Sequence, residues 1–280
     1  MGFVRVVEVF PPLFPSSSRK GSHIDLQKGV RRFIDDARRV RGFADILLIA
    51  DVKNPNLLEL STIGAAALLK ERARLDAAPV VVVRDFDRWQ FLSAVLTVLS
   101  LELGHLMLAW GDDSPARSGA ARGRDFGSLA QAVKEAALLR KRTAAPTRFL
   151  APVNVELLPS RGELARARGR LRAGAEYLLA QPPTTDPEAL DRHQSILRDA
   201  GLQERVLLNV FPFRDSKDVR ECEAYFGWRL PESLHRVAEK GQRALLEAES
   251  EVVRSARSRG FPGIYLNTRG SPSVVETLLS

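Results

Sequence analysis

The chain has 280 residues, of which 45% are apolar and 27% are charged. This balance is typical of a globular protein and excludes a disordered one. No apolar run reaches the roughly 20 residues that a membrane helix needs, and residues 3–9 predict a strand rather than a signal peptide. Cys222 is the only cysteine, which excludes an intramolecular disulfide and a cysteine-based zinc or iron–sulfur site. We therefore expect a soluble cytoplasmic protein.

The formal net charge of +8 arises from 42 basic and 34 acidic side chains. The basic residues are spread along the whole chain and often stand next to acids, as in Arg220-Glu221. A nucleic-acid binder more often concentrates them on one stripe among aromatic residues. The pattern favours a solvated basic surface, leaves open a preference for anionic small ligands, and argues against nucleic acid as a partner.

Short apolar runs alternate with longer stretches in which apolar residues recur every three or four positions. The eight runs are Val4–Val9, Asp45–Ala50, Pro79–Val83, His105–Trp110, Arg148–Val153, Tyr177–Gln181, Val206–Val210 and Gly263–Leu266. Most runs are continuously apolar, as expected for strands buried on both faces of a parallel sheet. The helical stretches include Leu57–Leu75, Trp89–Leu103, Leu129–Arg142, Glu163–Ala173 and Pro187–Ala200.

Eight strand–helix repeats in 280 residues match a (β/α)8 TIM barrel in count and length. A doubly wound open sheet is the alternative, but it often carries a glycine-rich first turn, whereas the first run here ends in Phe10-Pro11-Pro12. The sequence thus predicts an α/β fold, a TIM barrel that forms a single domain over residues 1–280. Pro231–Arg259 is predicted as a helical insertion, an extra helix before the eighth strand.

In such a barrel the ligand site lies at the carboxyl ends of the strands. The polar residues at these positions are Glu8, Asp51, Asn54, Arg84, Asp85, Asp112, Asp113, Asn154, Glu156, Gln181, Asn209, Asn267 and Arg269. No metal-ligand spacing is present, and the four histidines fall on helices, helix entries or strand starts, so neither a metal site nor a Ser-His-Asp triad is expected. These positions are the candidate site.

Glu8 is the most informative of these residues because it interrupts a strand that is otherwise built of Val and Phe. An apolar interior raises the pKa of a carboxyl group, which suits a general acid near neutral pH. The alternative is a glutamate that faces solvent at a strand edge or pairs with an arginine. Position alone does not separate the two interpretations.

Five motifs follow one another in the order found in one enzyme family. They are Val7-Glu8-Val9-Phe10-Pro11-Pro12; Val83-Arg84-Asp85 with Arg88; Leu106-Met107-Leu108-Ala109-Trp110-Gly111-Asp112; Ala173-Gly174-Ala175-Glu176-Tyr177 continuing through Gln181-Pro182 to Asp186-Pro187; and Phe261-Pro262-Gly263-Ile264-Tyr265. Together they resemble the methylenetetrahydrofolate reductases, and each motif coincides with a predicted strand. The resemblance covers nearly the whole chain.

The resemblance implies a barrel that holds FAD and takes electrons from NAD(P)H, in one-carbon metabolism. In that family a hydride converts methylenetetrahydrofolate to methyltetrahydrofolate, and the flavin supplies the hydride chemistry. The position of Glu8 then holds the acid that opens the folate ring, and that of Asp112 a carboxylate that favours the developing cation. The remaining implied roles are substrate binding by Gln181, Asp85 and Arg269 and cofactor binding by Arg84, Trp110, Gly111 and Asn154.

The sequence departs from the family on the flavin side. Trp110 stands where an arginine is frequent, Asn154 falls in a segment that replaces Ala-Tyr-Pro-Glu, and Arg172 replaces an acidic residue. Trp110 either stacks on a flat ring or packs in the core. Residues 117–124 either cover a pyrophosphate through their arginines or form a disordered basic loop. Simple structural roles are an N-cap for Asp112 and a strand-end hydrogen bond for Gln181.

Three functions therefore remain open. The first is a flavin-dependent reductase of a methylene-tetrahydropterin. The second is a flavin-free relative that passes hydride directly from a nicotinamide cofactor. The third is a folate- or pterin-binding barrel without redox activity that serves a methyl-transfer partner. In each case the partner is a small folate or pterin molecule, and a homo-oligomer is possible.

Overall fold

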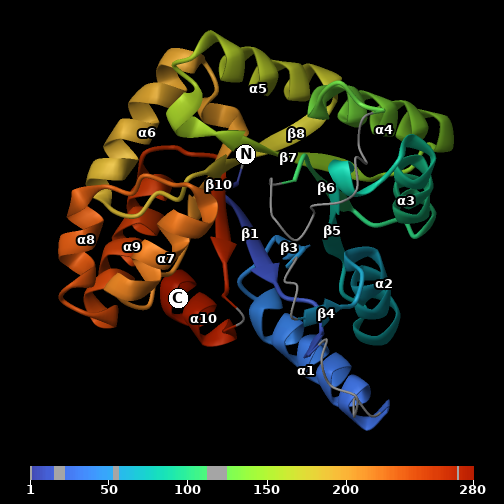
Figure 1. Ribbon diagram of the computed structural model, residues 1–280, viewed down its shortest axis with the longest axis horizontal. Helices are drawn as coiled ribbons and strands as arrows, with labels where there is room; N and C mark the ends of the chain where they lie inside the picture. Colours follow the sequence, from blue (N-terminus) through green and yellow to red (C-terminus); the bar gives the residue numbers. More distant parts are fainter. Residues whose placement is uncertain (1, 16–22, 53–56, 112–124, 270) are drawn as a thin grey trace.

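The computed structural model describes residues 2–15, 23–52, 57–111, 125–269 and 271–280. Eight parallel strands close into a barrel in the order β1-β10-β9-β8-β7-β6-β5-β3 (Figure 1). They are β1 (Val4–Val9), β3 (Ile46–Ile49), β5 (Ala77–Val82), β6 (His105–Ala109), β7 (Arg148–Asn154), β8 (Ala175–Gln181), β9 (Val206–Val210) and β10 (Gly263–Asn267). The predicted TIM barrel and all eight of its strands are confirmed.

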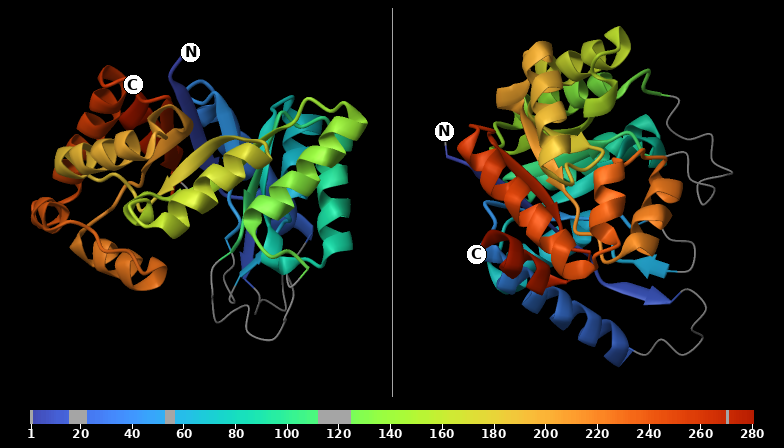
Figure 2. Two further views of the ribbon diagram at one scale, coloured as in Figure 1. Left: turned by 90° about the horizontal axis from the view of Figure 1, so that it is seen from above. Right: turned by 90° about the vertical axis from the view of Figure 1, so that its left-hand side faces the viewer.

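Helices form an outer layer around the strands (Figure 2). They are α1 (His23–Arg41), α2 (Thr62–Ala73), α3 (Arg88–Ser100), α4 (Leu129–Thr143), α5 (Arg161–Ala173), α6 (Pro187–Ala200), α7 (Ser216–Phe226), α8 (Glu232–Ala238), α9 (Gln242–Ser258) and α10 (Pro272–Leu279). Short polar side chains begin many of them: Asp87 caps α3 with a capping box, and Asp186 accepts the backbone N–H of Ala189 at 2.9 Å in α6. None of the helices in the described ranges has the length and apolar character needed to span a bilayer.

Two apolar cores hold the layers together. The larger core lies between the strands and the helices, and the smaller one fills the barrel. The fully or nearly buried members of the inner core are Val6, Ile46, Leu48, Ala78, Met107, Leu150, Tyr177, Leu179 and Leu207. Each strand thus contributes alternate residues to the two cores, which explains why the strands read as continuous apolar runs.

The region before the eighth strand differs from the single extra helix predicted for Pro231–Arg259. Gly241, at φ +94°, separates two helices, α8 and α9, because a left-handed backbone position ends regular helix. Helix α9 packs against β9, β10, α6 and α10, and so occupies the place of a regular barrel helix. The additional elements are instead α7 and α8, which enclose a small core with Phe213, Leu230 and Leu234.

The loops after β1 and β3 also differ from a plain barrel. Residues Leu13–Pro15 (β2) pair antiparallel with Leu57–Glu59 (β4). The start of the helix predicted for Leu57–Leu75 is therefore wrong, because Ser61 caps the helix only from Thr62 onward. The two-stranded sheet of β2 and β4 thus joins the loops that follow β1 and β3, at the carboxyl ends of the barrel strands.

The seam between the first and last barrel strands depends on one glycine. Gly263 pairs in register with Val4, and a Cβ atom at Gly263 would collide with the backbone carbonyl of Val4. A residue without a side chain is therefore required where β10 begins beside β1.

Candidate active site at the barrel mouth

A layer of polar side chains lies above the apolar interior of the barrel. Two residues beyond the interior positions of their strands come Glu8 on β1, Gln181 on β8, Asn209 on β9 and Asn267 on β10. The strand register pairs Glu8 with Asn267, Tyr265 with Asn209, and Asn154 with Gln181. Because paired residues of parallel strands share a face, these groups line one end of the barrel, at the carboxyl ends of its strands.

Glu8 is buried in this layer, with 6% of its surface exposed. Its Oε2 accepts a hydrogen bond from Asn267 Nδ2 at 3.0 Å and one from the hydroxyl of Tyr265. Burial raises the pKa of Glu8 from its ordinary value of 4.5 to about 8, and the hydrogen bond from Asn267 lowers it in part. A proton therefore stays on this carboxyl at neutral pH, and the placement excludes a glutamate in bulk solvent or paired with an arginine.

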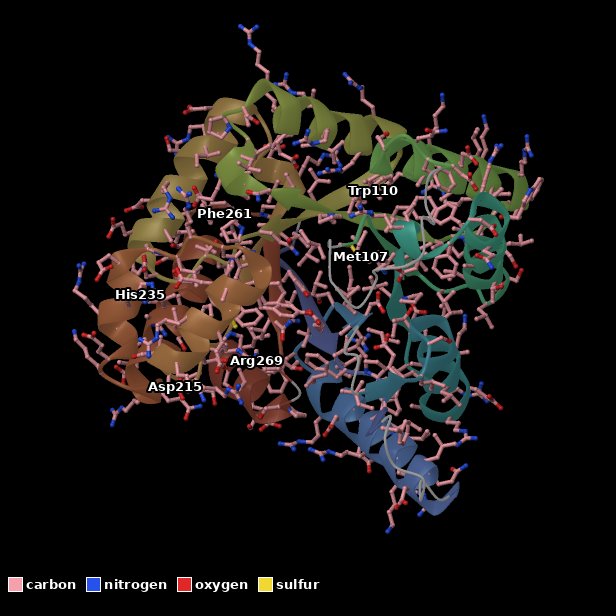
Figure 3. The ribbon with its side chains drawn as sticks, viewed as in Figure 1. Met107, Trp110, Asp215, His235, Phe261 and Arg269 are labelled. Atoms are coloured by element: carbon pink, nitrogen blue, oxygen red, sulfur yellow. The ribbon has the colours of Figure 1, made fainter. Side chains whose placement is uncertain are left out.

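Asn267 connects Glu8 to a partly buried ion pair. Its Oδ1 accepts the backbone N–H of Arg269 at 2.8 Å. The guanidinium of Arg269 binds both carboxylate oxygens of Asp218 on α7, at 2.7 and 2.8 Å, and lies over the ring of Phe211. Figure 3 shows Arg269 among the helices near α7 and α10, away from Trp110. We call Glu8, Tyr265, Asn267, Arg269 and Asp218 the acid network.

In the described part of the chain, the other side of the mouth is open. A pocket of about 1060 Å³ lies against the ends of β5, β6, β7 and β8. Its walls include five of the residues for which the sequence predicted ligand contacts, namely Arg84, Trp110, Gly111, Asn154 and Gln181. We call this space the ring pocket. All four residues that the resemblance assigned to a cofactor thus meet in one cavity, together with one assigned to the substrate.

The polar residues of the ring pocket differ in their freedom. Gln181 is exposed, and its carboxamide makes no hydrogen bond within the described ranges. Asn154 Oδ1 accepts the backbone N–H of Leu157 at 3.2 Å and so caps the short helical turn after β7. Arg84 Nη1 lies 3.5 Å from the carbonyl oxygen of Gly111. Gln181 is therefore the residue best placed to pair with a ligand.

Trp110 and Gly111 directly follow the end of β6. Trp110 is partly buried and packs against the outer core, and its carbonyl oxygen accepts the backbone N–H of Arg84 at 3.3 Å. It therefore takes part in core packing and also presents a surface to the pocket. Gly111 has φ +96°, a conformation that favours glycine, so the chain turns sharply where it leaves the strand.

The structure does not place the other candidates at the ring pocket. Asp112, Asp113, Asn54 and the arginines of residues 117–124 fall outside the described residues. Asp85 ends a short 3₁₀ turn after β5 and is not among the residues that line the ring pocket. Arg269 is bound to Asp218, so its described position does not bring it into the ring pocket.

Sequence reasoning missed the aromatic side of the ring pocket. Tyr225 and Phe226, at the end of α7, line it with 66% and 41% of their surfaces exposed. Phe226 stacks on Trp228 at 4.2 Å between ring centroids, and Tyr225 meets Phe226 edge to face at 4.8 Å. We call Tyr225 and Phe226 the aromatic wall. The cluster Tyr-Phe-Gly-Trp was visible in the sequence, but nothing there placed α7 across the mouth.

A second polar cluster lies behind the mouth. Glu156 accepts hydrogen bonds from Arg192 and, at 3.0 Å, from Nε2 of the buried His193, whose Nδ1 lies 2.9 Å from the hydroxyl of Thr184. Hydrogen bonds from His193 and Arg192 lower the pKa of Glu156 to about 2. Thr184 and His193 have no exposed surface, so the cluster fixes the β8–α6 loop rather than forming a reactive site.

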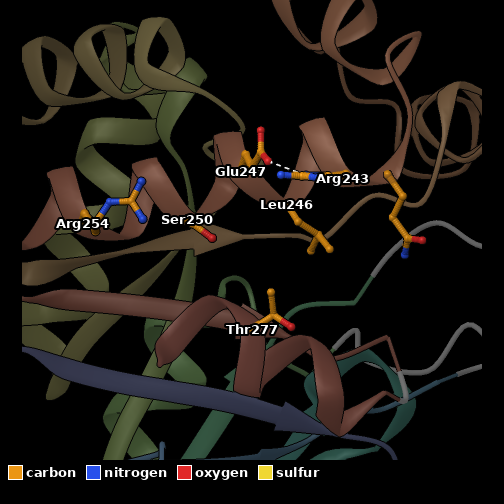
Figure 4. A pocket seen from close by; sticks show the side chains of 7 residues that line it. Arg243, Leu246, Glu247, Ser250, Arg254 and Thr277 are labelled. Carbon is orange, nitrogen blue, oxygen red and sulfur yellow. Dashed lines mark hydrogen bonds and ion pairs between the residues drawn. The ribbon is translucent and has the colours of Figure 1, made fainter.

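A smaller cavity lies on the outside of the barrel. It measures about 460 Å³ between α9 and α10 and is lined by residues such as Gln242, Arg243 and Thr277 (Figure 4). Arg243 is bound to Glu247 at 2.9 Å in the same wall. No strand end reaches this cavity among the residues that line it, so the ring pocket remains the candidate ligand site.

No protein-family model matches the chain, and no curated protein matches it by sequence. Solved structures do match in fold. A protein from Clostridium thermocellum that binds two copies of 5-methyl-5,6,7,8-tetrahydrofolic acid is 12% identical, with a TM-score of 0.63 over 99% of this chain and 94% of that one.

Two further solved structures are also similar in fold. A 2,3-dimethylmalate lyase of the PEP mutase/isocitrate lyase superfamily is 12% identical, with a TM-score of 0.53 over 99% of this chain and 80% of that one. An oxaloacetate acetylhydrolase is 10% identical, with a TM-score of 0.52 over 95% and 75% of the two chains. At these identities the likeness establishes a shared TIM-barrel fold.

Proposed function

We propose that this barrel binds a reduced folate, or a related reduced pterin, at its mouth and reduces a methylene group on it to a methyl group. The observation that carries the proposal is Glu8, a buried carboxyl with a pKa raised to about 8 in the polar layer at the strand ends. An acid that is protonated at neutral pH has the property needed for protonating a ring nitrogen. The family resemblance and the fold shared with a folate-binding protein support the choice of ligand.

The proton balance of the reaction defines the role of Glu8. In the proposed step its proton goes to the ring nitrogen N10 of the methylene-bridged pterin as the bond from that nitrogen to the methylene carbon breaks. The methylene carbon remains bound to N5 as an iminium cation, which a hydride then converts to the methyl group. The carboxylate left on Glu8 is stabilised by the hydrogen bonds from Asn267 and Tyr265.

The ring pocket supplies recognition of a flat heterocycle. Gln181 offers one acceptor and two donors, which match the alternating donors and acceptors on a pterin edge. Trp110 and the aromatic wall offer surfaces on which planar rings pack. Pairing by Gln181 and stacking by the aromatic groups would orient the ligand, while Glu8 acts from the opposite side of the mouth.

The residues of the ring pocket also fit a flavin. A volume of about 1060 Å³ exceeds the needs of a pterin alone, and Arg84 and Asn154 stand at strand ends near Gly111, which also lines the pocket. FAD, when bound, would supply hydride transfer from NAD(P)H to the folate. Arg84, Trp110, Gly111 and Asn154 would hold it.

The spectrum and the reduction assay test this function together. We expect the purified protein to show flavin absorption and to oxidise NADH or NADPH when methylenetetrahydrofolate is added. If a colourless protein catalyses the same reaction, the hydride passes directly from the nicotinamide to the folate without a flavin. A protein that binds no reduced pterin in calorimetry would refute the proposal as a whole.

A second candidate is a pterin-binding barrel without redox activity that serves a methyl-transfer partner. The observation in its favour is that the similar Clostridium thermocellum protein binds 5-methyl-5,6,7,8-tetrahydrofolic acid, the reduced form of the proposed substrate. Tight binding of methyltetrahydrofolate by a colourless protein that does not oxidise NADH or NADPH would decide for this candidate.

A further inference from the structure

The acid network continues from Glu8 to a helix that lies outside the barrel. Glu8 on β1 and Asn267 on β10 are in register, and Arg269 follows two residues after Asn267. Asp218, in the first turn of α7, binds Arg269 through both of its carboxylate oxygens. A series of three contacts therefore connects α7 to the acid.

The middle contact decides which end of the Asn267 side chain faces Glu8. A carboxamide has one end that donates and one that accepts. The donating end favours an ionised carboxyl, whereas the accepting end favours a protonated one. Because the backbone N–H of Arg269 occupies Oδ1 at 2.8 Å, Nδ2 is directed to Glu8 at 3.0 Å.

The backbone of Arg269 needs support to make this contact. Arg269 has φ +50°, a left-handed conformation that is unfavourable for a residue with a side chain. Asp218 is 4% exposed and also accepts the backbone N–H of Arg214 at 3.0 Å, so it is a fixed anchor for the guanidinium. The ring of Phe211 lies 5.0 Å below the guanidinium carbon and restricts it further.

We infer that Asp218 and Arg269 are positioning residues for Glu8: by holding the left-handed backbone at Arg269, they fix the Asn267 carboxamide with its donating end on the Glu8 carboxyl. The effect is to make the proton of a deeply buried acid easier to release than burial alone would allow. The relevance to catalysis rests on the proposed function, but the effect on Glu8 itself does not.

The groups in contact with Glu8 are few in the described part of the chain. On β10 they are Tyr265 and Asn267, and on β3 the residue in register is the apolar Leu48. Tyr265 is thus the titratable group that contacts Glu8 directly. Its contact does not pass through Arg269, so a change at Arg269 leaves it in place.

The test measures the titration of Glu8 without any ligand. The unfolding free energy of the full chain is followed against pH, with and without Glu8→Gln, and the difference between the two curves reports the folded-state pKa of Glu8. Arg269→Ala should raise that pKa by about one unit, the size expected from the loss of one hydrogen bond to the charged form.

Two further variants separate positioning from general damage. Arg269→Gly loses the same ion pair but adopts a positive φ freely, so we expect it to raise the pKa less than Arg269→Ala does. Arg214 is a second cation bound to Asp218, and 63% of its side chain is exposed. Arg214→Ala removes this cation and should leave the pKa of Glu8 unchanged. If Arg269 had a purely structural role, Arg269→Gly would shift the pKa of Glu8 at least as far as Arg269→Ala.

The outcomes are distinct. No shift in folded Arg269→Ala, or an equal shift in Arg214→Ala, would overturn the inference. If Arg269→Ala does not fold, Arg269→Lys keeps the charge without the paired hydrogen bonds and should shift the titration in the same direction; an unshifted lysine variant would also overturn it. Failure to bind any reduced pterin, with the titration shift present, would refute the proposed function alone.

Discussion

On the β1–β10 side of the barrel mouth, Glu8 is buried and both ends of the Asn267 carboxamide are hydrogen-bonded. On the β6–β8 side, Gln181 is exposed beside a pocket of about 1060 Å³. Burial in an apolar region can shift the pKa of a carboxyl by several units, whereas an open region with an unpaired carboxamide can accept a ligand. Under the proposed function, proton chemistry and ring recognition are therefore divided between the two sides.

The largest effect is expected when the acid alone is removed from the β1–β10 side. Glu8→Gln keeps the shape but cannot supply a carboxylic proton, so folate reduction should fall by about two to four orders of magnitude. Single-turnover reduction of methylenetetrahydrofolate measures it, beside reduction of any bound flavin by NAD(P)H, which needs no folate protonation and should survive. Equal loss in both steps would mean that the variant has lost its fold or its cofactor.

The same substitution should change how stability depends on pH. The pKa of Glu8 is raised from 4.5 to about 8, so between these values the folded protein holds a proton that the unfolded chain has released. The unfolding free energy of the parent should therefore fall as the pH rises through this window, by roughly 3–5 kcal/mol relative to Glu8→Gln. Denaturant unfolding from pH 4 to pH 9 measures the difference.

Below about pH 4.5 the Glu8 carboxyl is protonated in both the folded and the unfolded protein. The free-energy cost of ionising it in the folded state is therefore absent there. The pKa of Glu249 is also raised by burial, so this residue adds its own pH dependence to the unfolding free energy. That contribution is the same in the parent and in Glu8→Gln and cancels in their difference. Parallel curves for the two proteins would contradict the buried, protonated state of Glu8.

A smaller effect is expected from a substitution on the open side of the mouth. Gln181→Ala should weaken binding of methyltetrahydrofolate about tenfold, because ligand donors and acceptors lose their partner. Calorimetric titration measures it, and Gln242→Ala, in the outer cavity between α9 and α10, is the matched control. Equal affinities of the parent and Gln181→Ala would remove Gln181 from recognition.

The smallest effect is expected at the aromatic wall. Tyr225→Ala should weaken the same binding about fivefold, the scale of one lost aromatic contact at a partly exposed site. Trp89→Ala is the control, since Trp89 is 78% exposed on α3 and does not line the ring pocket. If both variants bind like the parent, the wall lies too far from the ligand to contribute.

The sequence was a good guide to whatever depends on short-range pattern. Eight buried runs predicted eight strands, and the polar residues at the strand ends included three members of the ring pocket, Arg84, Asn154 and Gln181, since both follow from residue spacing. The other two, Trp110 and Gly111, were implied only by the family resemblance. Glu8 was recognisable from the sequence because burying a carboxyl within an apolar strand costs folding free energy, which points to a role for the group. Its burial and its contacts with β10 needed the structure.

Contacts that are distant in sequence escaped prediction. Arg269 was expected at the substrate, but its partner Asp218 lies 51 residues away on α7, a helix that no motif identified. The aromatic wall was missed for the same reason. Pro231–Arg259 contained a regular barrel helix and not only an insertion, because its division at Gly241 depends on packing rather than on periodicity.

The closing seam between β1 and β10 has a consequence for biosynthesis. Glu8 and Asn267 are 259 residues apart in the chain, and they meet only where Gly263 lets the last strand lie against the first. While the chain emerges from the ribosome, β1 keeps one unpaired edge until β10, the last strand of the barrel, has been made. The environment that tunes the acid is thus among the last parts of the molecule to form, so partly synthesised chains carry the glutamate without its raised affinity for a proton.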